Sequence, residues 1–341
     1  CNDVPNGIFQ SQVIDVVKTL TQLSGKDVRL VSFIPRSGFI KNKQEILKEL
    51  PNAKVYPILF GLSKWKKLKV LLKFVTKRKA SAICRGPLAT DLAIGLFKKV
   101  VYDGRAAVKS EIKEFDVTGN KMLDADFIIA EKNAVLKSDF RIAVSNKLVE
   151  YWRSNFKYES DKHVIIPCTL SSKHSLSQTY IEESPIIKIV YSGGVGGWQS
   201  FSLMTSVLSE LMSKQENIHV LFLAKPHEKM DSLIALYPTR CSRKWVNHNE
   251  VSAELENCDY GLLVRDENGT NAVASPVKFA EYLNAGLKVL ISVGLGDFTD
   301  FVIKNDCGKL VSNDKVELSS VSFEEKQRIN QLAQCSFSKE S

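Results

Sequence analysis

Short runs of β-branched residues alternate with amphipathic stretches of ten to sixteen residues over nearly the whole chain. Strands separated by helix-length segments pair in parallel, because the helix carries the chain back to the start of the next strand. The pattern therefore predicts an α/β protein with parallel sheets and crossover helices. The strands expected in the first half are Val28–Ile34, Lys54–Leu59, Ala80–Cys84, Val100–Tyr102, Arg141–Val144 and His163–Ile166. Those expected in the second half are Ile186–Tyr191, Ile218–Ala224, Lys244–Val246, Asp259–Val264, Lys288–Ser292 and Gly308–Val311.

The strand–helix series is interrupted once. Residues Thr169–Ser184 are polar, rich in serine and aperiodic, and Pro185 follows them. A chain of 341 residues is also longer than one hydrophobic core usually supports. We therefore expect two domains, residues 1–170 and 185–341.

Composition excludes several classes of protein. With 44% hydrophobic and 25% charged residues, the chain is typical of a globular protein. No apolar run approaches the roughly 18 to 20 residues that span a bilayer, and no signal-peptide pattern opens the chain. The seven cysteines are scattered, without a C-x-x-C pair or zinc-ligand spacing, which favours a reducing, cytoplasmic location.

Charge is divided unevenly between the halves. Residues 1–170 hold 30 Lys and Arg against 17 Asp and Glu, a net charge of +13, and the remainder carries −4, so that the two sum to +9. The first half therefore either meets an anionic partner or has a basic solvated surface.

The segment Asn271–Ser292 predicts an anion-binding helix. Ser275 is a favourable N-cap, Pro276 suits the first helical position, and Gly286 suits the position after the helix, which predicts a helix over Pro276–Ala285. Because this helix follows a strand, its unpaired N–H groups, starting at Val277, point to the carboxyl edge of the sheet.

Lys278 adds a positive charge to the first turn of this helix. Glu281 lies three residues further on, and therefore on the same face, where a carboxylate can reach a sugar or ribose hydroxyl. A solvent-exposed Lys–Glu pair is the alternative interpretation.

A glycine-rich turn, Tyr191–Trp198, stands between a strand and a helical pattern that starts at Gln199. Glycines such as Gly193 and Gly194 allow the backbone to approach a phosphate or sugar closely, although a merely tight turn is the alternative. Gln199 stands where a G-x-G-x-x-G motif requires glycine, which disfavours a dinucleotide-dependent oxidoreductase. Arg265 directly follows the strand Asp259–Val264, where a guanidinium can neutralise a diphosphate, unless it is a surface arginine.

The stretch GLLVRDENGTNAVASPVKFAEYLNAGLKVLIS, residues 261–292, resembles the donor-site segment of family 4 type retaining glycosyltransferases of the GT-B fold. The resemblance implies two Rossmann-like, doubly wound domains that face a cleft, with the nucleotide sugar bound by the C-terminal domain and the acceptor by the N-terminal domain. It implies that Glu281 binds the ribose. Val273 stands where the family has the first acid of its paired-Glu motif, and the S-P-x-K-x-x-E-Y pattern resembles a subgroup. No Arg or Lys follows the glycine turn, which is a second departure from the family.

Similar loops occur in the first half. Pro5-Asn6-Gly7-Ile8-Phe9 resembles the family's first strand-to-helix loop, and Cys84-Arg85-Gly86-Pro87 and Tyr102-Asp103-Gly104-Arg105 resemble R-G-P and D-x-R-G loops of polysaccharide transferases. The resemblance makes Gly7, Arg85, Asp103 and Arg105 candidate acceptor-side residues. It also places Trp245 to His248 near the nucleobase.

The catalytic machinery expected is modest. The first histidine is His163, which argues against a catalytic histidine base among residues 1–162. A retaining transferase relies on leaving-group stabilisation by cations and a helix dipole, which we assign to Arg265 and Lys278, with no obligatory metal or cofactor. The alternative is a degenerate GT-B protein that binds nucleotide sugar, or supports a partner enzyme, without turnover.

The segment Ser63–Lys79 has eight basic residues and no acidic residue, with Trp65, Leu68, Leu72 and Val75 at helical spacing. This profile predicts a helix on an anionic membrane, peripheral at the inner face of the plasma membrane. The equally weighted alternative is a helix whose apolar stripe faces its own core. No nucleic-acid-binding motif accompanies the charge, so nucleic acid is not an expected partner.

Overall fold

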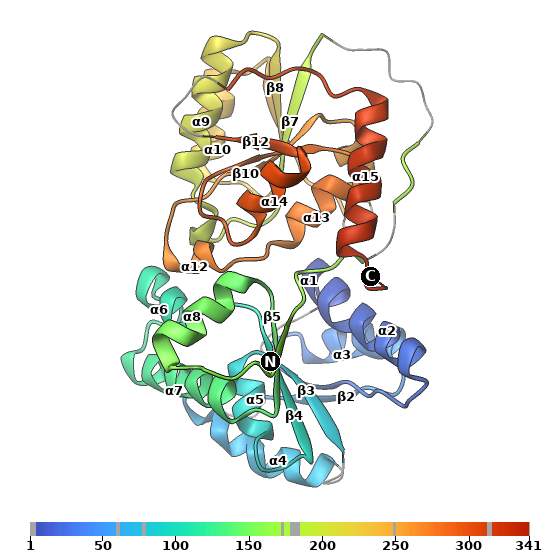
Figure 1. Ribbon diagram of the computed structural model, residues 1–341, viewed down its shortest axis with the longest axis vertical. Helices are drawn as coiled ribbons and strands as arrows, with labels where there is room; N and C mark the ends of the chain where they lie inside the picture. The colour runs from blue at the N-terminus through green and yellow to red at the C-terminus, as the bar shows by residue number, and fades with distance from the viewer. Residues whose placement is uncertain are drawn as a thin grey trace. The chain divides into compact units, whose positions relative to one another are not determined.

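The computed structural model describes residues 5–58, 62–76, 80–171, 174–177, 185–247, 250–311 and 316–340. Its contacts divide the chain into two compact units, unit 1 up to Pro167 and unit 2 from Cys168 to Lys339 (Figure 1). All strand pairs are parallel in the described residues, which confirms the predicted α/β class. Each predicted strand is present, with ends that differ by at most three residues.

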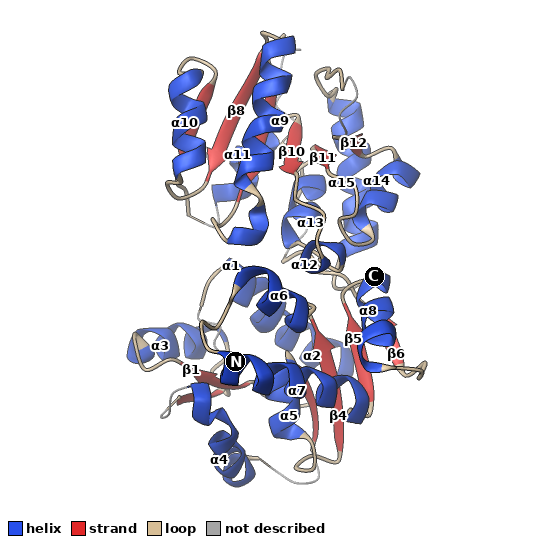
Figure 2. Cartoon of the chain, turned by 90° about the vertical axis from the view of Figure 1, so that its left-hand side faces the viewer, coloured by secondary structure: helices blue, strands red, loops and turns tan. Residues whose placement is uncertain are grey.

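Unit 1 contains a two-stranded and a four-stranded sheet. The pair is β1–β2, and the larger sheet has the order β3-β4-β5-β6, whose later strands Figure 2 shows side by side. The strands are β1 Val31–Ile34, β2 Lys54–Pro57, β3 Ser81–Arg85, β4 Lys99–Gly104, β5 Phe140–Ala143 and β6 His163–Ile165. Because a helix lies in each connection between paired strands, the strands of each sheet run in one direction.

The helices of unit 1 begin where local capping favours them. The Asn120 side chain accepts hydrogen bonds from the N–H groups of Met122 and Leu123, and Ser145 accepts from Leu148. The helices are α1 Gly7–Phe9, a π-helix Gln10–Ile14, α2 Asp15–Ser24, α3 Phe39–Glu49, a 3₁₀ helix Leu62–Lys67, α4 Leu68–Val75, α5 Pro87–Ala93, α6 Val108–Phe115, α7 Lys121–Lys137 and α8 Asn146–Phe156.

The apolar stripe of the basic segment Ser63–Lys79, expected to face a membrane, is buried inside unit 1. Trp65, Leu68 and Leu72, predicted as the membrane-facing stripe, are 2%, 5% and 7% exposed and pack in the core of unit 1 with Phe33 and Leu92. The Val75 side chain and residues 77–79 lie outside the described part. The apolar stripe therefore faces the protein's own core, because burying a tryptophan and two leucines there removes more apolar area from water than any surface contact.

Two other apolar residues of α4 lie on the surface. Val70 is 62% exposed and Phe74 is 81% exposed, and the exposed Lys66 and Lys73 are on the same segment. None of the helices in the described ranges combines the length and the apolar character that crossing a bilayer requires.

Unit 2 is built on one six-stranded parallel sheet with the order β12-β11-β10-β7-β8-β9. The strands are β7 Ile187–Ser192, β8 Ile218–Leu223, β9 Cys241–Lys244, β10 Tyr260–Leu263, β11 Lys288–Ile291 and β12 Gly308–Leu310. The order reverses between β7 and β10, since the chain moves outward to β9 and then returns to the other side of β7. In open α/β sheets such a switch point leaves a crevice at the carboxyl ends of the two strands.

Helices cover both faces of this sheet. Figure 1 shows α9 and α10 to one side of β7 and β8, and α13, α14 and α15 to the other, and each face has its own buried cluster. The helices are α9 Phe201–Lys214, α10 Glu228–Leu236, α11 Val251–Glu256, α12 Gly269–Ala272, α13 Val277–Asn284, α14 Phe298–Asn305 and α15 Phe323–Phe337. Burial on both faces explains why the central strands are almost continuously apolar.

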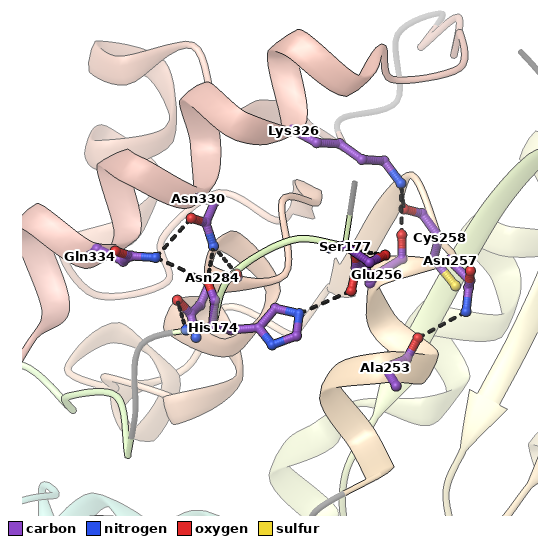
Figure 3. Close-up of polar contacts among 10 residues, drawn as sticks. All are labelled: His174, Ser177, Ala253, Glu256, Asn257, Cys258, Asn284, Lys326, Asn330 and Gln334. Carbon is purple, nitrogen blue, oxygen red and sulfur yellow. Dashed lines mark hydrogen bonds and ion pairs between the residues drawn. The ribbon is translucent and has the colours of Figure 1, made fainter. Parts of the chain in front are cut away.

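The chain that enters unit 2 is held by polar contacts, as Figure 3 shows. His174 contacts the Glu256 carboxylate at 3.1 Å, and the Ser177 hydroxyl donates to the same carboxylate at 2.6 Å. The His174 carbonyl accepts from Asn330 at 2.9 Å. The predicted boundary Thr169–Ser184 thus includes residues that belong to unit 2, while 172–173 and 178–184 lie outside the described residues.

Candidate functional site

The carboxyl ends of β7 and β10 bring two predicted elements together. The glycine-rich turn follows Ser192, the last residue of β7, and Arg265 follows β10 by two residues. The strand order therefore places the turn and Arg265 at the switch point of the sheet.

The glycine turn is shaped by the side chain of Lys278. Gly193 has φ +147°, a conformation that favours glycine, and a Cβ built on it would collide with Cε of Lys278. A Cβ on Gly194 would meet no atom within 4 Å. A 3₁₀ turn, Gly197–Gln199, follows, so the next helix begins at Phe201 and not at Gln199 as predicted.

Helix α13 is fixed against the two central strands by Tyr282. Its hydroxyl accepts the N–H of Ser192 at 2.9 Å and donates to the Leu262 carbonyl at 3.4 Å. A side chain on Gly261 would collide with the Tyr282 ring, so glycine in β10 allows the helix to pack closely. The position of Lys278 relative to the sheet is therefore set by its own helix.

The predicted start of this helix is wrong in detail. Helix α13 begins at Val277 with Pro276 at the N-cap, and Ser275 makes no cap. The Ser275 hydroxyl instead accepts the N–H of Cys168 at 2.9 Å, because the chain entering unit 2 competes successfully for it. Gly286, with φ +78°, follows the helix as predicted.

Lys278 is partly buried, and its ammonium contacts neutral groups. Nζ donates to the Tyr191 hydroxyl at 3.0 Å and to Gln199 Oε1 at 3.2 Å, and lies 4.2 Å from the centre of the Tyr191 ring. Burial holds the pKa of Lys278 well below its usual range, the nearby Arg265 lowers it further, and Glu281 opposes both. The half-buried Glu281 therefore lies close enough to favour the charged lysine.

Arg265 is 6% exposed and also has neutral partners. Nη1 donates to Asn271 Oδ1 and Nη2 to Gln199 Oε1, both at 3.3 Å, while buried Nε has no hydrogen-bond partner among the described residues. Burial lowers the pKa of Arg265 to about 10. Two cations thus converge on one amide oxygen, an arrangement that a bound dianion would stabilise.

Sequence reasoning missed Gln199 and Asn271. In the sequence, Gln199 stood out only because it replaces a glycine of the G-x-G-x-x-G motif, and Asn271 only as the first residue of the segment Asn271–Ser292. Both are buried, at 7% and 1%, and both accept from the cations. No local pattern marks Gln199, because Arg265 and Lys278 lie 66 and 79 residues away from it, whereas Asn271 lies six residues after Arg265. Val273, in place of the first acid, is 4% exposed.

In unit 1 the structure brings together three of the four acceptor-side candidates. Asp103 pairs with Arg105 at 2.7 Å and with Arg85 at 3.7 Å, at the carboxyl ends of β3 and β4. Gly7 begins α1, whose N-cap Asn6 accepts from the Phe9 N–H at 2.8 Å.

Comparisons with known proteins agree on the fold. No protein-family model and no curated protein matches the sequence. A sucrose-phosphate synthase from Thermosynechococcus elongatus matches 96% of this chain and 90% of its own, with 12% identity and a TM-score of 0.68. WaaG, a glycosyltransferase involved in lipopolysaccharide biosynthesis, matches 98% of this chain and 88% of its own, with 13% identity and a TM-score of 0.63.

A third similar structure has ligands. S. aureus TarM, in complex with fondaparinux, α-GlcNAc-glycerol and UDP, matches 78% of this chain and 51% of its own, with 14% identity and a TM-score of 0.52. The chain accordingly has the two Rossmann-like domains of the GT-B fold.

Proposed function

We propose that this chain is a retaining glycosyltransferase that moves a sugar from a nucleotide-diphosphate donor to a saccharide or lipid-linked acceptor in polysaccharide biosynthesis. The observation that carries the proposal is the convergence of Arg265 and Lys278 on Gln199, beside the glycine turn at the switch point. Unit 2 then binds the donor and unit 1 the acceptor. UDP in the similar TarM structure makes uridine nucleotides the first donors to test.

The two cations stabilise the leaving group. Negative charge accumulates on the diphosphate as its bond to the sugar breaks, and preorganised cations with neutral partners stabilise that charge more strongly than the ground state. The backbone at Pro276 and Val277, at the positive end of α13, and the open turn at Gly194 provide further contacts for phosphate. Ser275 supports this start through its bond to Cys168.

Glu281 completes the donor site as the ligand of the ribose. The carboxylate lies one helical turn after Lys278 and interacts with its charge. A phosphate at the start of α13 would therefore sit one turn from a hydroxyl-binding carboxylate. The proposed transfer needs no metal, because the two side chains supply the positive charge.

The exposed surface of α4 supports a peripheral site on an anionic membrane at the inner face of the plasma membrane. Phe74 and Val70 are four residues apart on one helix and both exposed. Basic residues of the same segment, including Lys73, suit anionic headgroups. A cytoplasmic protein bound to the membrane in this way would reach a lipid-linked acceptor.

Buried, apolar Val273 favours the alternative, a protein that binds nucleotide sugar without turnover. Arg265→Lys distinguishes the two, since it keeps a charge but loses the guanidinium geometry. For an enzyme we expect turnover of UDP-sugars to fall on the order of 100-fold, with a smaller change in donor affinity. Binding without hydrolysis or transfer by the unaltered protein would reject the enzyme.

A further inference from the structure

Three ionised side chains meet at the carboxyl edge of the larger sheet in unit 1. Arg85 is the last residue of β3, Asp103 pairs with it in the strand register, and Arg105 follows β4. Asp103 Oδ1 lies 2.7 Å from Arg105 Nε, and Oδ2 lies 3.7 Å from Arg85 Nη1. Both guanidiniums therefore lie within ion-pair distance of the carboxylate, although neither of these two contacts has hydrogen-bond geometry.

The cluster combines a buried acid with two partly exposed arginines. The Asp103 side chain is 8% exposed, whereas those of Arg85 and Arg105 are 23% and 18% exposed. The three formal charges sum to +1. The carboxylate thus offsets one of the two positive charges, and the cluster keeps a net positive charge.

Neighbouring residues support the orientation of Arg105 and leave room beside Arg85. Gln12, which is 3% exposed, accepts from Arg105 Nη1 at 3.4 Å through a neutral amide. A Cβ built on Gly86 would meet no atom within 4 Å, so the backbone after Arg85 borders open space. Paired guanidiniums next to open space suit an oxygen anion, which they bind with parallel hydrogen bonds.

We propose that Arg85 and Arg105 bind an oxyanionic group, phosphoryl or carboxyl, carried by the acceptor. This inference rests on the proposed function, and it names the chemical class of its second substrate. The carboxyl edge of a parallel sheet is the usual place for a ligand in an open α/β domain. Asp103 is the counter-charge that offsets one of the two arginines.

The test measures the binding of small anions to the full chain in saturating UDP, which occupies the donor site in unit 2. A parallel titration uses the Lys278→Ala variant, in which the donor site binds phosphate poorly. The probes are glycerol 3-phosphate, D-glycerate and neutral glycerol, followed by ligand-observed NMR. At least one anion should bind and glycerol should not. Arg85→Gln and Arg105→Gln should each weaken binding about tenfold or more. Arg29→Gln is the matched control, because Arg29 pairs with Asp27 at an exposed site.

Asp103→Asn separates an anion site from a purely structural ion cluster. Removing the carboxylate raises the charge of the cluster from +1 to +2, so a correctly folded variant should bind the anion at least as tightly as the unaltered protein. Should Arg105→Gln unfold, Arg105→Lys replaces it and should bind more weakly than arginine, since lysine lacks the planar fork.

The outcomes assign the chemistry. Binding of glycerol 3-phosphate alone indicates a phosphoryl group, and binding of D-glycerate alone indicates a carboxyl group. Unchanged binding in both folded arginine variants, equal binding of glycerol, or no anion binding at millimolar concentration overturns the site. Sugar transfer to a neutral acceptor without anion binding would reject this inference alone, whereas anion binding without sugar transfer would reject the proposed function alone.

Discussion

Cε of Lys278 fills the space in which a side chain on Gly193 would begin. The glycine in the turn is therefore required by the protein's own lysine, which approaches from a helix 85 residues later in the chain. The turn and the lysine are closely packed, so a side chain at position 193 would displace Lys278.

Gly193→Ala should displace Lys278 and weaken UDP binding by about tenfold or more, because the new methyl group overlaps the lysine stem at an unfavourable φ. Calorimetric titration with UDP measures this. Gly25→Ala is the matched control and should bind UDP normally, since it also adds a methyl group at a positive φ but meets open space in unit 1, outside the donor-binding unit. Equal affinities in the two variants would contradict the close packing at Gly193.

Gln199→Glu should weaken UDP binding by about tenfold or more, although the two side chains have nearly the same shape. The new carboxylate would lie between Arg265 and Lys278 and compete with the diphosphate for both. Gln22→Glu, on the exposed face of α2, adds the same charge elsewhere and should have no effect. The prediction fails if Gln199→Glu binds UDP normally.

Binding of UDP should take up protons over the pH range in which Lys278 titrates. Burial lowers the pKa of Lys278 in the free protein, and a bound diphosphate raises it again by favouring the ammonium. Between the free and bound pKa values, binding is accompanied by proton uptake, and affinity falls as pH rises. Titration calorimetry in buffers of different ionisation enthalpy measures the uptake. Lys278→Met should abolish it, and equal uptake in that variant would exclude this lysine.

Stability should decrease from about pH 4.5 to 7 because of Glu131. Burial raises its pKa from 4.5 to about 7, against the lowering effect of hydrogen bonds from the Lys109 and Val108 N–H groups and from Tyr151. The folded state then holds a proton that the unfolded chain has released, so the free energy of unfolding falls by up to about 3 kcal/mol as pH rises through this window.

Glu131→Gln should flatten this dependence, as measured by urea unfolding at several pH values. Glu111, whose pKa burial also raises to about 7, leaves a remaining slope. Glu45→Gln, at an exposed ion pair with Lys41, should retain the full slope. A slope unchanged in Glu131→Gln would show that Glu131 is ionised in the folded protein.

Phe74→Ser should reduce co-sedimentation with anionic vesicles without lowering the melting temperature, because the side chain is 81% exposed. Ile40→Ser, at a residue of α3 that is 74% exposed, is the control and should sediment normally. Trp65→Ala should instead cost about 3 to 5 kcal/mol of stability, as expected for a buried tryptophan. Equal sedimentation of the Phe74 and Ile40 variants would contradict the proposed contact between α4 and the membrane.

The local sequence predicted the strands from their runs of β-branched residues, and the helix that carries Lys278 from Pro276 and Gly286 at its ends. It could not predict Ser275, whose hydroxyl binds a backbone N–H 107 positions earlier. For the same reason Gln199 carried no signal, since its partners are Arg265, two residues after β10, and Lys278 in α13. Periodicity at Trp65 identified an apolar stripe correctly but could not tell a protein core from a membrane, as both bury the same residues.

The absence of Arg or Lys directly after the glycine turn also wrongly suggests that the turn lacks positive charge. Positive charge reaches the turn from Arg265 and Lys278, which follow and belong to other elements. The charges of a folded site come from any element that reaches it in three dimensions. The number of basic residues in one loop therefore underestimates the positive charge of the site.

The polar contacts of residues 168–177 have a consequence for excising unit 2 as an independent fragment. Cys168 binds Ser275, the Leu170 N–H binds the Phe337 carbonyl at 2.9 Å, and His174 contacts Glu256. A fragment cut at Pro185 would uncover these partners and the Leu170 contact in the core. We therefore expect a fragment that folds on its own to start no later than Cys168, because the chain that leads into the sheet covers part of its core.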